Sequence, residues 1–558
     1  MLNFLNVISE GGQTWAHRVR MLRQLLKIVF IFSFLVAFLA VSYKLLKDHY
    51  DLILSLWYYL KAKCLSLFGI EKTSISTSSW YHVTNQRYGG EDVLLPVKRI
   101  LQVSAPKVSL LWEKGAETLT FGIKVFAVSV MGFVGYFLFR GTASKRRKHI
   151  SGKRIINPFL LTLWLKISRK SSSIKIGRLP LLKDSETTHM LITGGTGSGK
   201  TNCLHHMLKN VRKSGAKNIV VDTTGAFVER YYREGKDVIL NPFDKRGVEW
   251  SPWAECRDKF DYDDLAESLI PTSYNENENY WRTAARSVLS SLLQKLEKTP
   301  RVSDVVRWLL FEPMYSLCEF VEGTKAASHL DKGSEKTAAS VRSVASSFVE
   351  CLEHIGDAEN SFSIRNWVEQ PGDSWLFISC NPSERAAIAP LLSAWISIAV
   401  KGVLELPPSR KRKVWFFLDE LPTLNRVKRL ETLLTEGRKY GACAVLAFQS
   451  PAQIEAIYGR EGSKILVGNC ATKVVFAEYD AETAERISRI FGQREIGECQ
   501  EGISFGANDI RDGVNLSYQK KKEQTVSATE VQSLVANQAF VKLPGKLPIT
   551  KIKISIAS

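Results

Sequence analysis

A glycine-rich stretch contains the residues whose types and spacing most clearly indicate chemistry. Residues 194–201 fit the pattern G-x-x-x-x-G-K-[S/T], an apolar run at 190–192 precedes them, and a helical pattern begins at Asn202. The backbone N–H groups of such a loop, with the N-terminus of the following helix, form a cradle for phosphate oxygens. The sequence therefore predicts a nucleotide site made by Gly194, Gly195, Thr196, Gly197, Ser198, Gly199, Lys200 and Thr201.

Two side chains of this loop have separate predicted roles. Lys200 is placed to reach the β- and γ-phosphates, and the Thr201 hydroxyl is placed to hold Mg²⁺. A glycine-rich turn without a ligand is the alternative interpretation. The apolar strand before the loop and the helix after it favour the nucleotide site, because this is the setting in which such loops bind phosphate.

A second signal lies at the end of another apolar strand. Residues 414–418 read Val-Trp-Phe-Phe-Leu, and Asp419 and Glu420 follow directly. We expect Asp419 to hold Mg²⁺, directly or through water, and Glu420 to polarise the attacking water. Many strands end in acidic residues, so this pair alone is a weak signal for a Mg²⁺ site. Together with the intact glycine loop it is a strong one. No N-K-x-D guanine signature is present, which favours ATP over GTP.

Strands and helices alternate through the second half of the chain. Strands are expected at 190–193, 218–221, 238–240, 375–379, 414–418, 443–448 and 472–477, with closing strands near 539–543 and 551–556. This order predicts an α/β fold with a doubly wound parallel sheet, whose ligand lies outside the carboxyl ends of the strands. Residues 251–366 show helical spacing instead. We therefore expect an all-α domain at 251–366, inserted between two parts of a nucleotide-binding domain at 140–250 and 367–558.

Two apolar runs are long enough to cross a membrane. Residues 28–43 carry no charge and, with flanking lysines able to snorkel, extend to a candidate span at 25–46. Residues 121–139 carry one charge, Lys124, and give a second candidate span at 119–139. A buried helix of a soluble core is the alternative for each run. A cleaved signal peptide is disfavoured, because the first run is too long and no A-x-A-like site follows it.

Basic residues predict the orientation of these spans. The chain of 558 residues has a formal net charge of +20, and residues 140–183 include thirteen Lys or Arg and no Asp or Glu. The positive-inside rule then places the N-terminus at 1–24 and everything after 139 in the cytoplasm, and residues 47–118 in the periplasm. The basic run serves mainly as a topology signal in contact with anionic lipid. A smaller role as a collar for a passing polyanion stays open.

The nine cysteines include no C-x-x-C pair, so the sequence indicates neither a disulfide framework nor a zinc ribbon. Eight of them fall in the expected cytoplasmic parts. Only Cys64 falls in the periplasmic segment, where it has no intramolecular partner.

Several short runs outside these motifs share a family pattern. They are Gly11-Gly12-Gln13, Arg18-x-Arg20-Met21, Asp222-x-x-Gly225-x-Phe227, Leu240-Asn241-Pro242-x-Asp244, Glu335-Lys336-Thr337-Ala338, Gly506-Ala507-x-x-x-Arg511-Asp512-Gly513 and Leu543-Pro544-Gly545. With the glycine loop, they make nearly the whole chain resemble the type IV coupling proteins of the TraD family, which serve F-type conjugation systems.

The resemblance implies a RecA-like P-loop NTPase domain with an inserted all-α domain, two N-terminal transmembrane helices and a homo-hexameric ring at the bacterial inner membrane. It implies that ATP hydrolysis, with Mg²⁺, drives single-stranded DNA and its relaxase from the relaxosome into a type IV secretion channel. Arg438 matches the proposed arginine finger of the family, and Gln449 matches its sensor glutamine. Without the resemblance, Arg438 would be read as a surface charge favoured by a helix C-terminus.

This sequence departs from the family pattern in two places. Ala226 follows Gly225 where relatives often have Glu, and the sequence ends thirteen residues after Gly545, without the acidic tail of longer F-type members. We therefore expect cargo recruitment to use the all-α domain, another surface or another protein. Two other functions stay open. One is a chromosome-segregation type DNA translocase, whose usual four spans and winged-helix tail are not visible. The other is a recruiting platform for protein substrates.

Overall fold

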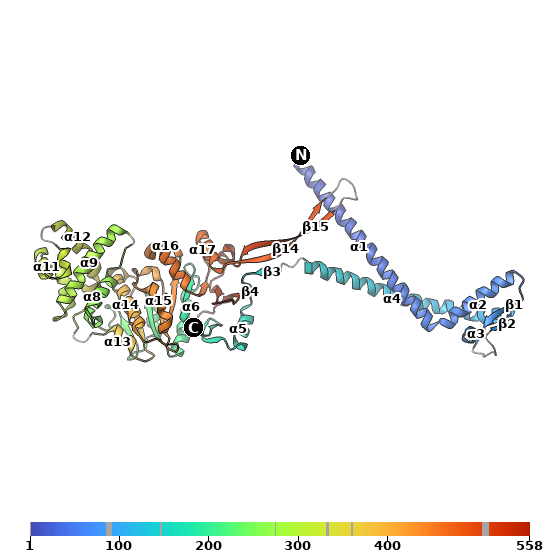
Figure 1. Ribbon diagram of the computed structural model, residues 1–558, viewed down its shortest axis with the longest axis horizontal. Helices are drawn as coiled ribbons and strands as arrows, with labels where there is room; N and C mark the ends of the chain where they lie inside the picture. The colour runs from blue at the N-terminus through green and yellow to red at the C-terminus, as the bar shows by residue number, and fades with distance from the viewer. Residues whose placement is uncertain are drawn as a thin grey trace. The chain divides into compact units, whose positions relative to one another are not determined.

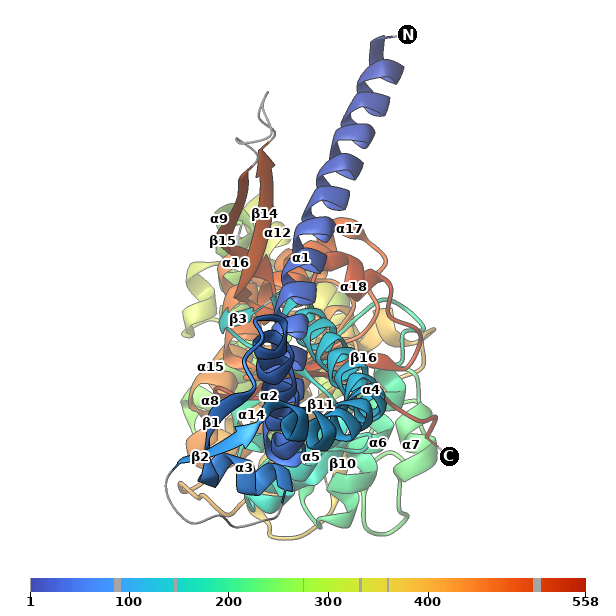
Figure 2. The ribbon, with the colours of Figure 1, turned by 90° about the vertical axis from the view of Figure 1, so that its right-hand side faces the viewer.

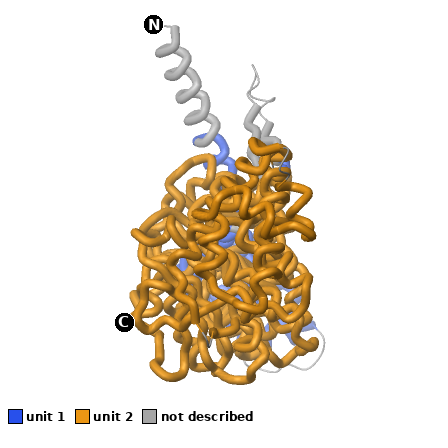
Figure 3. The backbone as a smooth tube through the Cα atoms, turned by 90° about the vertical axis from the view of Figure 1, so that its left-hand side faces the viewer, with its two compact units in different colours: residues 1–147, 498–519 blue, residues 148–497, 520–558 orange. Residues whose placement is uncertain are grey.

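The computed structural model describes residues 2–84, 92–144, 148–273, 275–330, 334–358, 361–504 and 513–557. The chain divides into two compact units, which Figure 3 colours separately. The first unit comprises residues 1–147 and 498–519, and the second comprises 148–497 and 520–558.

Two long helices, α1 (Leu2–Asp48) and α4 (Val97–Ser144), dominate the first unit (Figure 1). They contain the apolar runs expected to span a membrane, and they touch through the rings of Phe30 and Phe126, whose centroids are 5.4 Å apart. In the most apolar window of each helix, only 17% and 6% of the residues are buried. An exposed apolar surface of this extent is unfavourable in water, so lipid is the solvent that suits these helices.

The segment between the two apolar runs folds around a small core of its own. It comprises α2 (Tyr50–Leu67), α3 (Thr77–Thr84) and the antiparallel strands β1 (Lys72–Ser76) and β2 (Asp92–Pro96). Tyr58 packs edge-to-face on Trp80 with ring centroids 5.4 Å apart, and both side chains are buried. Val97 and Ile100, in the first turn of α4, belong to the same core. The 48-residue helix α4 is about 72 Å long, which exceeds the span of one bilayer.

Seven consecutive parallel strands, which end at β9 (Val238–Leu240) on one edge, make up most of a ten-stranded sheet in the second unit. The strands expected at 190–193, 238–240, 375–379 and 414–418 have those same bounds in the structure. In spatial order the seven are β13 (Thr472–Val475), β7 (Met190–Thr193), β12 (Ala442–Phe448), β11 (Val414–Leu418), β8 (Lys217–Asp222), β10 (Trp375–Ser379) and β9 (Val238–Leu240).

Alternating side chains of these strands enter two separate cores, one on each face of the sheet. On β11, Phe416 packs in one core, and Trp415 and Phe417 pack in the other. Because both faces are covered, the strands are apolar along almost their whole length. The first face is covered by α14 (Arg385–Glu405), α15 (Leu430–Glu436) and α16 (Pro451–Asn469), and the second by α5 (Pro158–Ile167), α6 (Lys200–Lys213) and α7 (Ala226–Tyr231).

One edge of the sheet differs from the expected all-parallel arrangement. Strand β16 (Gln538–Lys542) runs antiparallel to both β13 and β17 (Ile549–Lys553). Residues 543–548, which join β16 to β17, are too few for the crossover of a dozen or more residues that a parallel pair needs. The sheet is therefore mixed, with β4 (Ile155–Ile156) as its outer strand. This edge has its own core with α17 (Ala481–Phe491) and α18 (Ala528–Gln532).

A helical insert separates the two parts of the α/β unit, as the sequence predicts. In the described part of residues 251–366, strand pairing is limited to the single bridge between Trp250 and Phe362. The insert is continuous with the core on the α14 face of the sheet, and Figure 1 shows most of its helices gathered together. Its helices are α8 (Lys259–Leu269), α9 (Glu276–Lys295), α10 (Val302–Val306), α11 (Met314–Phe320), α12 (Glu335–Val349) and α13 (Ile364–Glu369).

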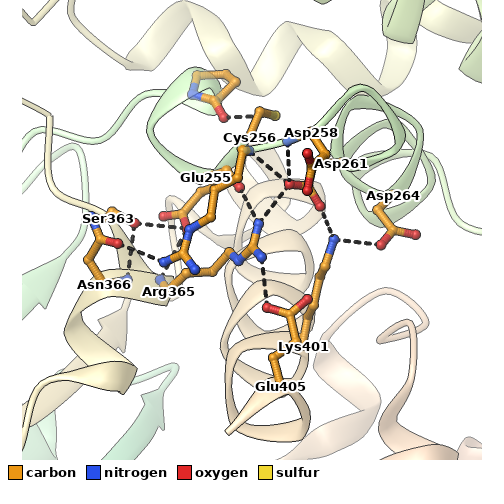
Figure 4. Close-up of polar contacts among 12 residues, drawn as sticks. Glu255, Cys256, Asp258, Asp261, Asp264, Ser363, Arg365, Asn366, Lys401 and Glu405 are labelled. Carbon is orange, nitrogen blue, oxygen red and sulfur yellow. Dashed lines mark hydrogen bonds and ion pairs between the residues drawn. The ribbon is translucent and has the colours of Figure 1, made fainter.

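A buried ionic cluster joins this insert to the sheet domain (Figure 4). Asp261 of α8 accepts a hydrogen bond of 2.8 Å from Arg365 of α13 and pairs with Lys401 of α14. Lys401 also donates to Asp264, over 2.7 Å. Burial raises the pKa of Asp261, but the hydrogen bonds from Lys401, backbone N–H groups and Arg365 outweigh burial and lower this pKa to about 2. Asp261 is thus charged at neutral pH and holds three helices together.

Asp264 extends this cluster to the segment that follows Glu420. It accepts hydrogen bonds from the Lys428 ammonium at 2.8 Å and from the Arg429 guanidinium at 2.9 Å. Arg429 has a φ of 66°, a left-handed conformation that is unfavourable for this residue type. Asp264 therefore connects the helical insert to the loop between β11 and α15.

Besides the ten-stranded sheet and the pair of β1 and β2, the described residues form two further small sheets. Strands β14 (Gln493–Ser504) and β15 (Gly513–Gln524) lie side by side (Figures 1 and 2), and β14 also pairs with β3 (Lys148–Ser151). Strand β5 (Ser171–Ile176) pairs with β6 (Leu179–Leu182). Of the family run beginning at Gly506, residues 506–512 lie outside the described residues.

Candidate nucleotide site

The glycine loop joins the end of β7 to the start of α6. Gly194, Gly197 and Gly199 have φ values of 149°, 71° and 114°, which side-chain-bearing residues rarely adopt. A Cβ atom on Gly194 would lie 2.6 Å from the Cβ of Phe476, and one on Gly199 would lie 2.7 Å from the side-chain oxygen of Asn537. The loop therefore needs glycine at these positions, and the close approach of its backbone fits a phosphate cradle.

Lys200 begins α6 and is almost buried. Its ammonium donates hydrogen bonds to the carbonyls of Gly194 at 2.7 Å and Gly195 at 3.1 Å. Burial lowers the pKa of Lys200, while the negative charges of Glu420 and Asp419 raise it. Phosphate oxygens accept stronger hydrogen bonds from an ammonium than neutral carbonyls do, so this side chain is well placed to bind a nucleotide.

Asp419 and Glu420 lie at the end of β11, as the sequence predicts. Asp419 is 8% exposed. Burial, followed by the negative charges of Glu420 and Asp222, raises the pKa of Asp419 to about 6. A bound cation relieves this unfavourable environment, so Asp419 fits a Mg²⁺ site with the exposed Thr201 hydroxyl. Glu420 has a φ of 55°, which turns the chain at this edge of the sheet.

Gln449 follows β12 and connects two of the predicted elements. The Thr196 hydroxyl donates to the side-chain oxygen of Gln449 over 3.2 Å. The side-chain nitrogen of Gln449 in turn donates to a carboxylate oxygen of Glu420 over 3.3 Å. The structure thus brings the glycine loop, Gln449 and the acidic pair together at the carboxyl edge of the sheet.

Arg438 is separated from these residues. It lies in the short helix η7 (Gly437–Tyr440), which precedes β12 and contacts η1 (Glu186–Thr188) at the start of β7. Gln449 lies at the other end of the seven-residue strand β12, about 23 Å away along the strand. The Arg438 side chain is exposed, and within the described residues it has no hydrogen bond or ion pair. It therefore faces away from the phosphate loop of its own chain.

The structure adds an acidic residue that the sequence reasoning missed. Glu478 lies just beyond β13, on the opposite side of β7 from Gln449, and is 7% exposed. Among the described residues, one of its carboxylate oxygens is buried without a hydrogen-bond partner. Burial raises the pKa of Glu478, and the charge of Lys200 opposes this change. Asp419 and Gln449 were selected because each follows the carboxyl end of an expected strand. Glu478 directly follows the strand expected at 472–477, so the same rule could have identified it.

The last residues of the chain also lie against the start of α6. The Asn202 side chain donates to Asn537 and to the Ser555 carbonyl, each over 2.9 Å, and accepts from the Ala557 N–H at 2.8 Å. Periodicity could not reveal this contact, because it joins residues more than three hundred positions apart.

Comparisons with known proteins agree with this architecture. The family model described as the type IV secretion-system coupling protein DNA-binding domain matches residues 173–555. The coupling protein TraD of Escherichia coli (strain K12) is 29% identical, in an alignment that covers 98% of this chain and 77% of that protein. A second relative, the probable conjugal transfer protein TraG of Sinorhizobium fredii (strain NBRC 101917 / NGR234), is 23% identical over 67% of this chain and 63% of that protein.

Solved structures give the same result. The unbound bacterial conjugative coupling protein TrwBdeltaN70 superposes with a TM-score of 0.68 and 28% identity, covering 74% of this chain and 94% of that one. The plasmid coupling protein TrwB in complex with ADP and Mg²⁺ superposes with a TM-score of 0.67 and 28% identity, covering 74% of this chain and 95% of that one. These matches confirm the RecA-like fold with an all-α insert. The family model covers more than half of the sequence, and the chain belongs to the type IV secretion-system coupling proteins.

Proposed function

We propose that this chain is an ATP-hydrolysing motor of the bacterial inner membrane. As a ring of six copies, it drives single-stranded DNA with its relaxase from the relaxosome into a type IV secretion channel. The observation that carries the proposal is the division of the predicted active site between two edges of one sheet. Lys200, Asp419, Glu420 and Gln449 lie at the carboxyl edge, and Arg438 lies at the amino edge.

At the carboxyl edge, each side chain has a defined task. The loop N–H groups and Lys200 bind and orient the β- and γ-phosphates of ATP. Thr201 and Asp419 hold Mg²⁺, which when bound neutralises phosphate charge. Glu420 accepts the proton of the attacking water. Gln449 holds the Glu420 carboxylate through its 3.3 Å hydrogen bond. The TrwB structure containing ADP and Mg²⁺ supports this assignment by its likeness in fold.

Arg438 completes the site of a neighbouring copy. Because it lies at the far end of β12 from its own Gln449, it cannot serve its own phosphate loop without unfolding the strand. In a head-to-tail ring, its exposed guanidinium faces the next subunit's γ-phosphate. Such a finger raises the rate by about 10³–10⁵, which corresponds to about 4–7 kcal/mol of barrier. Ring assembly therefore switches hydrolysis on.

The membrane helices and the charge of the chain agree with a role in DNA transfer. Helices α1 and α4 expose their apolar runs and cross the inner membrane, with the ends of the chain and the ATPase domain in the cytoplasm. The net charge of +20 suits a polyanionic cargo. The family description includes DNA binding, which supports DNA as the cargo.

ATP turnover by the full chain in lipid nanodiscs tests the proposal. We expect turnover to rise when single-stranded DNA is added at low salt, where phosphate contacts are strongest, and to vanish in Lys200→Ala. Turnover that is present but indifferent to DNA would instead favour a platform that recruits protein substrates. For the topology, a thiol reagent confined to the periplasm should label Cys64, which is exposed. Labelling of Cys64 from the cytoplasm alone would contradict two spans.

A further inference from the structure

Helix α5 presents an apolar face to solvent although it belongs to the folded α/β unit. Its sequence is Pro-Phe-Leu-Leu-Thr-Leu-Trp-Leu-Lys-Ile. We name as the α5 face the five side chains Phe159, Leu160, Leu163, Trp164 and Ile167, which are 69%, 57%, 43%, 46% and 73% exposed. At 3.6 residues per turn they occupy about 140° of the helix circumference.

The opposite side of α5 anchors the helix firmly. Leu161 and Leu165, one turn apart, are 1% and 0% exposed and pack in the core on the α6 face of the sheet. The Asn157 side chain caps the helix by accepting a hydrogen bond of 2.9 Å from the Phe159 N–H, and Pro158 occupies the first turn. The α5 face is therefore held in place by the fold, and its exposure is not a result of fraying.

The apolar surface continues beyond the helix. A hollow of about 900 Å³ borders Leu160 and Trp164. Its lining also includes Leu182, the segment 544–548 and the charged residues Lys170, Lys183 and Asp184. A contiguous apolar surface of this kind on a folded domain marks a binding surface for another apolar body.

The surroundings of the α5 face are predominantly basic, although the exposed Asp184 lines part of the hollow. Residues 148–183 include nine Lys or Arg and no Asp or Glu. Lys166 lies on α5 itself, and Arg169 and Lys170 follow it, all exposed. The Lys170 ammonium lies 5.6 Å from the centre of the Trp164 ring. An apolar face with Trp, Phe and Leu, bordered mainly by cations, matches the chemistry of a helix that lies in the surface of an anionic membrane.

The chain connects α5 closely to the second candidate span. Strand β3 begins at Lys148, four residues after α4 ends at Ser144, and four residues reach at most about 14 Å. Strand β4 and then α5 follow within ten residues of β3. Helix α5 is thus the first helix after that span, on the side where the basic residues place the cytoplasm.

We propose that α5 is an interfacial helix, whose exposed face lies in the cytoplasmic leaflet of the membrane that α1 and α4 cross. Its apolar side chains enter the boundary between headgroups and acyl chains, about 5–10 Å deep. Lys166, Arg169 and Lys170 contact anionic headgroups. The proposal rests on the membrane attachment proposed above and does not depend on ATP hydrolysis or DNA transfer.

A lipid surface fits this face better than a second copy of the chain does. Two copies meeting through the α5 face would bring together two regions in which Lys and Arg outnumber the acidic residues, which is unfavourable. Anionic headgroups neutralise the same cations and leave the apolar side chains in contact with acyl chains.

The test uses the full chain in nanodiscs of phosphatidylcholine and phosphatidylglycerol, without nucleotide. An environment-sensitive fluorophore is attached to Leu163→Cys, in a background carrying Cys64→Ser and Cys499→Ser. Nitroxide lipids labelled near the glycerol or at the methyl end of the acyl chain report depth, and aqueous iodide reports exposure. We expect a blue-shifted emission and several-fold stronger quenching by the shallow nitroxide than by the deep nitroxide or iodide.

Two labelled positions provide matched controls. Lys464→Cys, on the exposed side of α16, should be quenched by iodide and not by lipid. Val134→Cys, on α4, should be quenched by the deep nitroxide. The pair Phe159→Ser and Ile167→Ser, both at exposed positions, should return the Leu163 probe to iodide quenching without unfolding the protein.

The outcomes separate this inference from the proposals before it. Lipid quenching at Val134 with only iodide quenching at Leu163 overturns the interfacial helix and leaves membrane insertion standing. A Leu163 probe shielded from both lipid and iodide shows that protein covers the face, which also overturns it. Absence of lipid quenching at Val134 contradicts the membrane attachment itself. None of these readings depends on ATPase activity, so failure of the motor proposal is detected separately.

Discussion

The side-chain nitrogen of Gln449 donates a hydrogen bond to a carboxylate oxygen of Glu420 over 3.3 Å. The side-chain oxygen of Gln449 accepts a hydrogen bond from the Thr196 hydroxyl over 3.2 Å. One amide thus joins the loop predicted to hold the phosphates to the acid predicted to activate water. In the proposed mechanism, a change in the loop on nucleotide binding would reach Glu420 through the Gln449 side chain.

Replacement of Gln449 by Ala removes this connection. We expect nucleotide affinity to change little, because the phosphate cradle is intact. Turnover should fall by about 10²-fold, the size of effect that follows loss of one oriented polar group at a reacting centre. Fluorescent-nucleotide titration and steady-state ATPase assays measure the two quantities. Gln294→Ala, in the helical insert, is the control and should leave both unchanged. Normal turnover in Gln449→Ala would contradict the role assigned to the amide.

Substitution of Glu420 by Gln separates binding from chemistry. The amide keeps the size of the side chain but cannot accept the proton of water, so turnover should fall by about 10²–10⁴-fold while ATP still binds. Lys200→Ala should weaken binding as well, because it removes the ammonium predicted to contact the phosphates. Rapid-filtration binding with single-turnover hydrolysis distinguishes the two variants. Equal loss of ATP binding in both would argue that Glu420 holds the nucleotide and has no part in proton transfer.

Arg438→Ala tests whether the active site is shared between subunits. Nucleotide binding should persist and turnover should fall by about 10³-fold or more. Mixing Arg438→Ala with Lys200→Ala subunits should restore part of the activity, because some interfaces then pair an intact loop with an intact arginine. The adjacent exposed cation offers the control, since Lys439→Ala should retain turnover. Failure of the mixture to recover any activity would place both functions in one chain.

The buried cluster at Asp261 predicts a pH dependence of stability. The pKa of Asp261 in the folded protein, about 2, is below its usual value near 3.9, so its carboxylate stabilises the fold above pH 4. This contribution, on the order of 2 kcal/mol, is lost as pH falls from about 4 to about 2. Asp261→Asn removes the carboxylate that Lys401 and Arg365 share, leaving Lys401 with Asp264 and Arg365 with Glu405, and should be less stable than the parent protein at pH 7.

The difference between the parent protein and Asp261→Asn should shrink as pH approaches 2, because the parent then loses the same charge. Chemical unfolding followed by tryptophan fluorescence at several pH values measures this trend. The exposed residue Asp373 serves as the control, since Asp373→Asn should have little effect. A stability difference that stays constant between pH 7 and pH 2 would contradict the assignment.

The central sheet could be predicted from the sequence because its strands are buried on both faces. The run at 414–418 is apolar without interruption, and β11 has those bounds. The same rule placed Asp419 and Gln449 at one edge of the sheet. Between the strands at 375–379 and 414–418 lies the helix α14. Although α14 is as apolar as a membrane span, 78% of its most apolar window is buried inside the fold.

The strands β14 and β15 were not predicted, because they lack the apolar alternation that marks a half-buried strand. Residues 520–522 are three exposed lysines on β15, and on β14 Arg494 and Glu495 stand next to each other. These segments are strands because they pair with each other and because β14 pairs with β3. Such pairing joins residues far apart in the chain, so local sequence patterns do not reveal it. The antiparallel edge at β16 and β17 was not predicted for a related reason. The alternation of helices and strands does not reveal the direction in which the last strands run.

The position of Arg438 relative to Gln449 has a mechanical consequence. One continuous segment of the chain contains both, and the seven-residue strand between them is clamped by hydrogen bonds to β11 and β7. Such a strand behaves as a stiff rod. In the proposed ring, a pull on Arg438 from the neighbour's nucleotide would be transmitted lengthwise to Gln449, and from there to Glu420. Each subunit would then hydrolyse ATP at a time set by the nucleotide state of its neighbour. Hydrolysis would proceed around the ring in one direction.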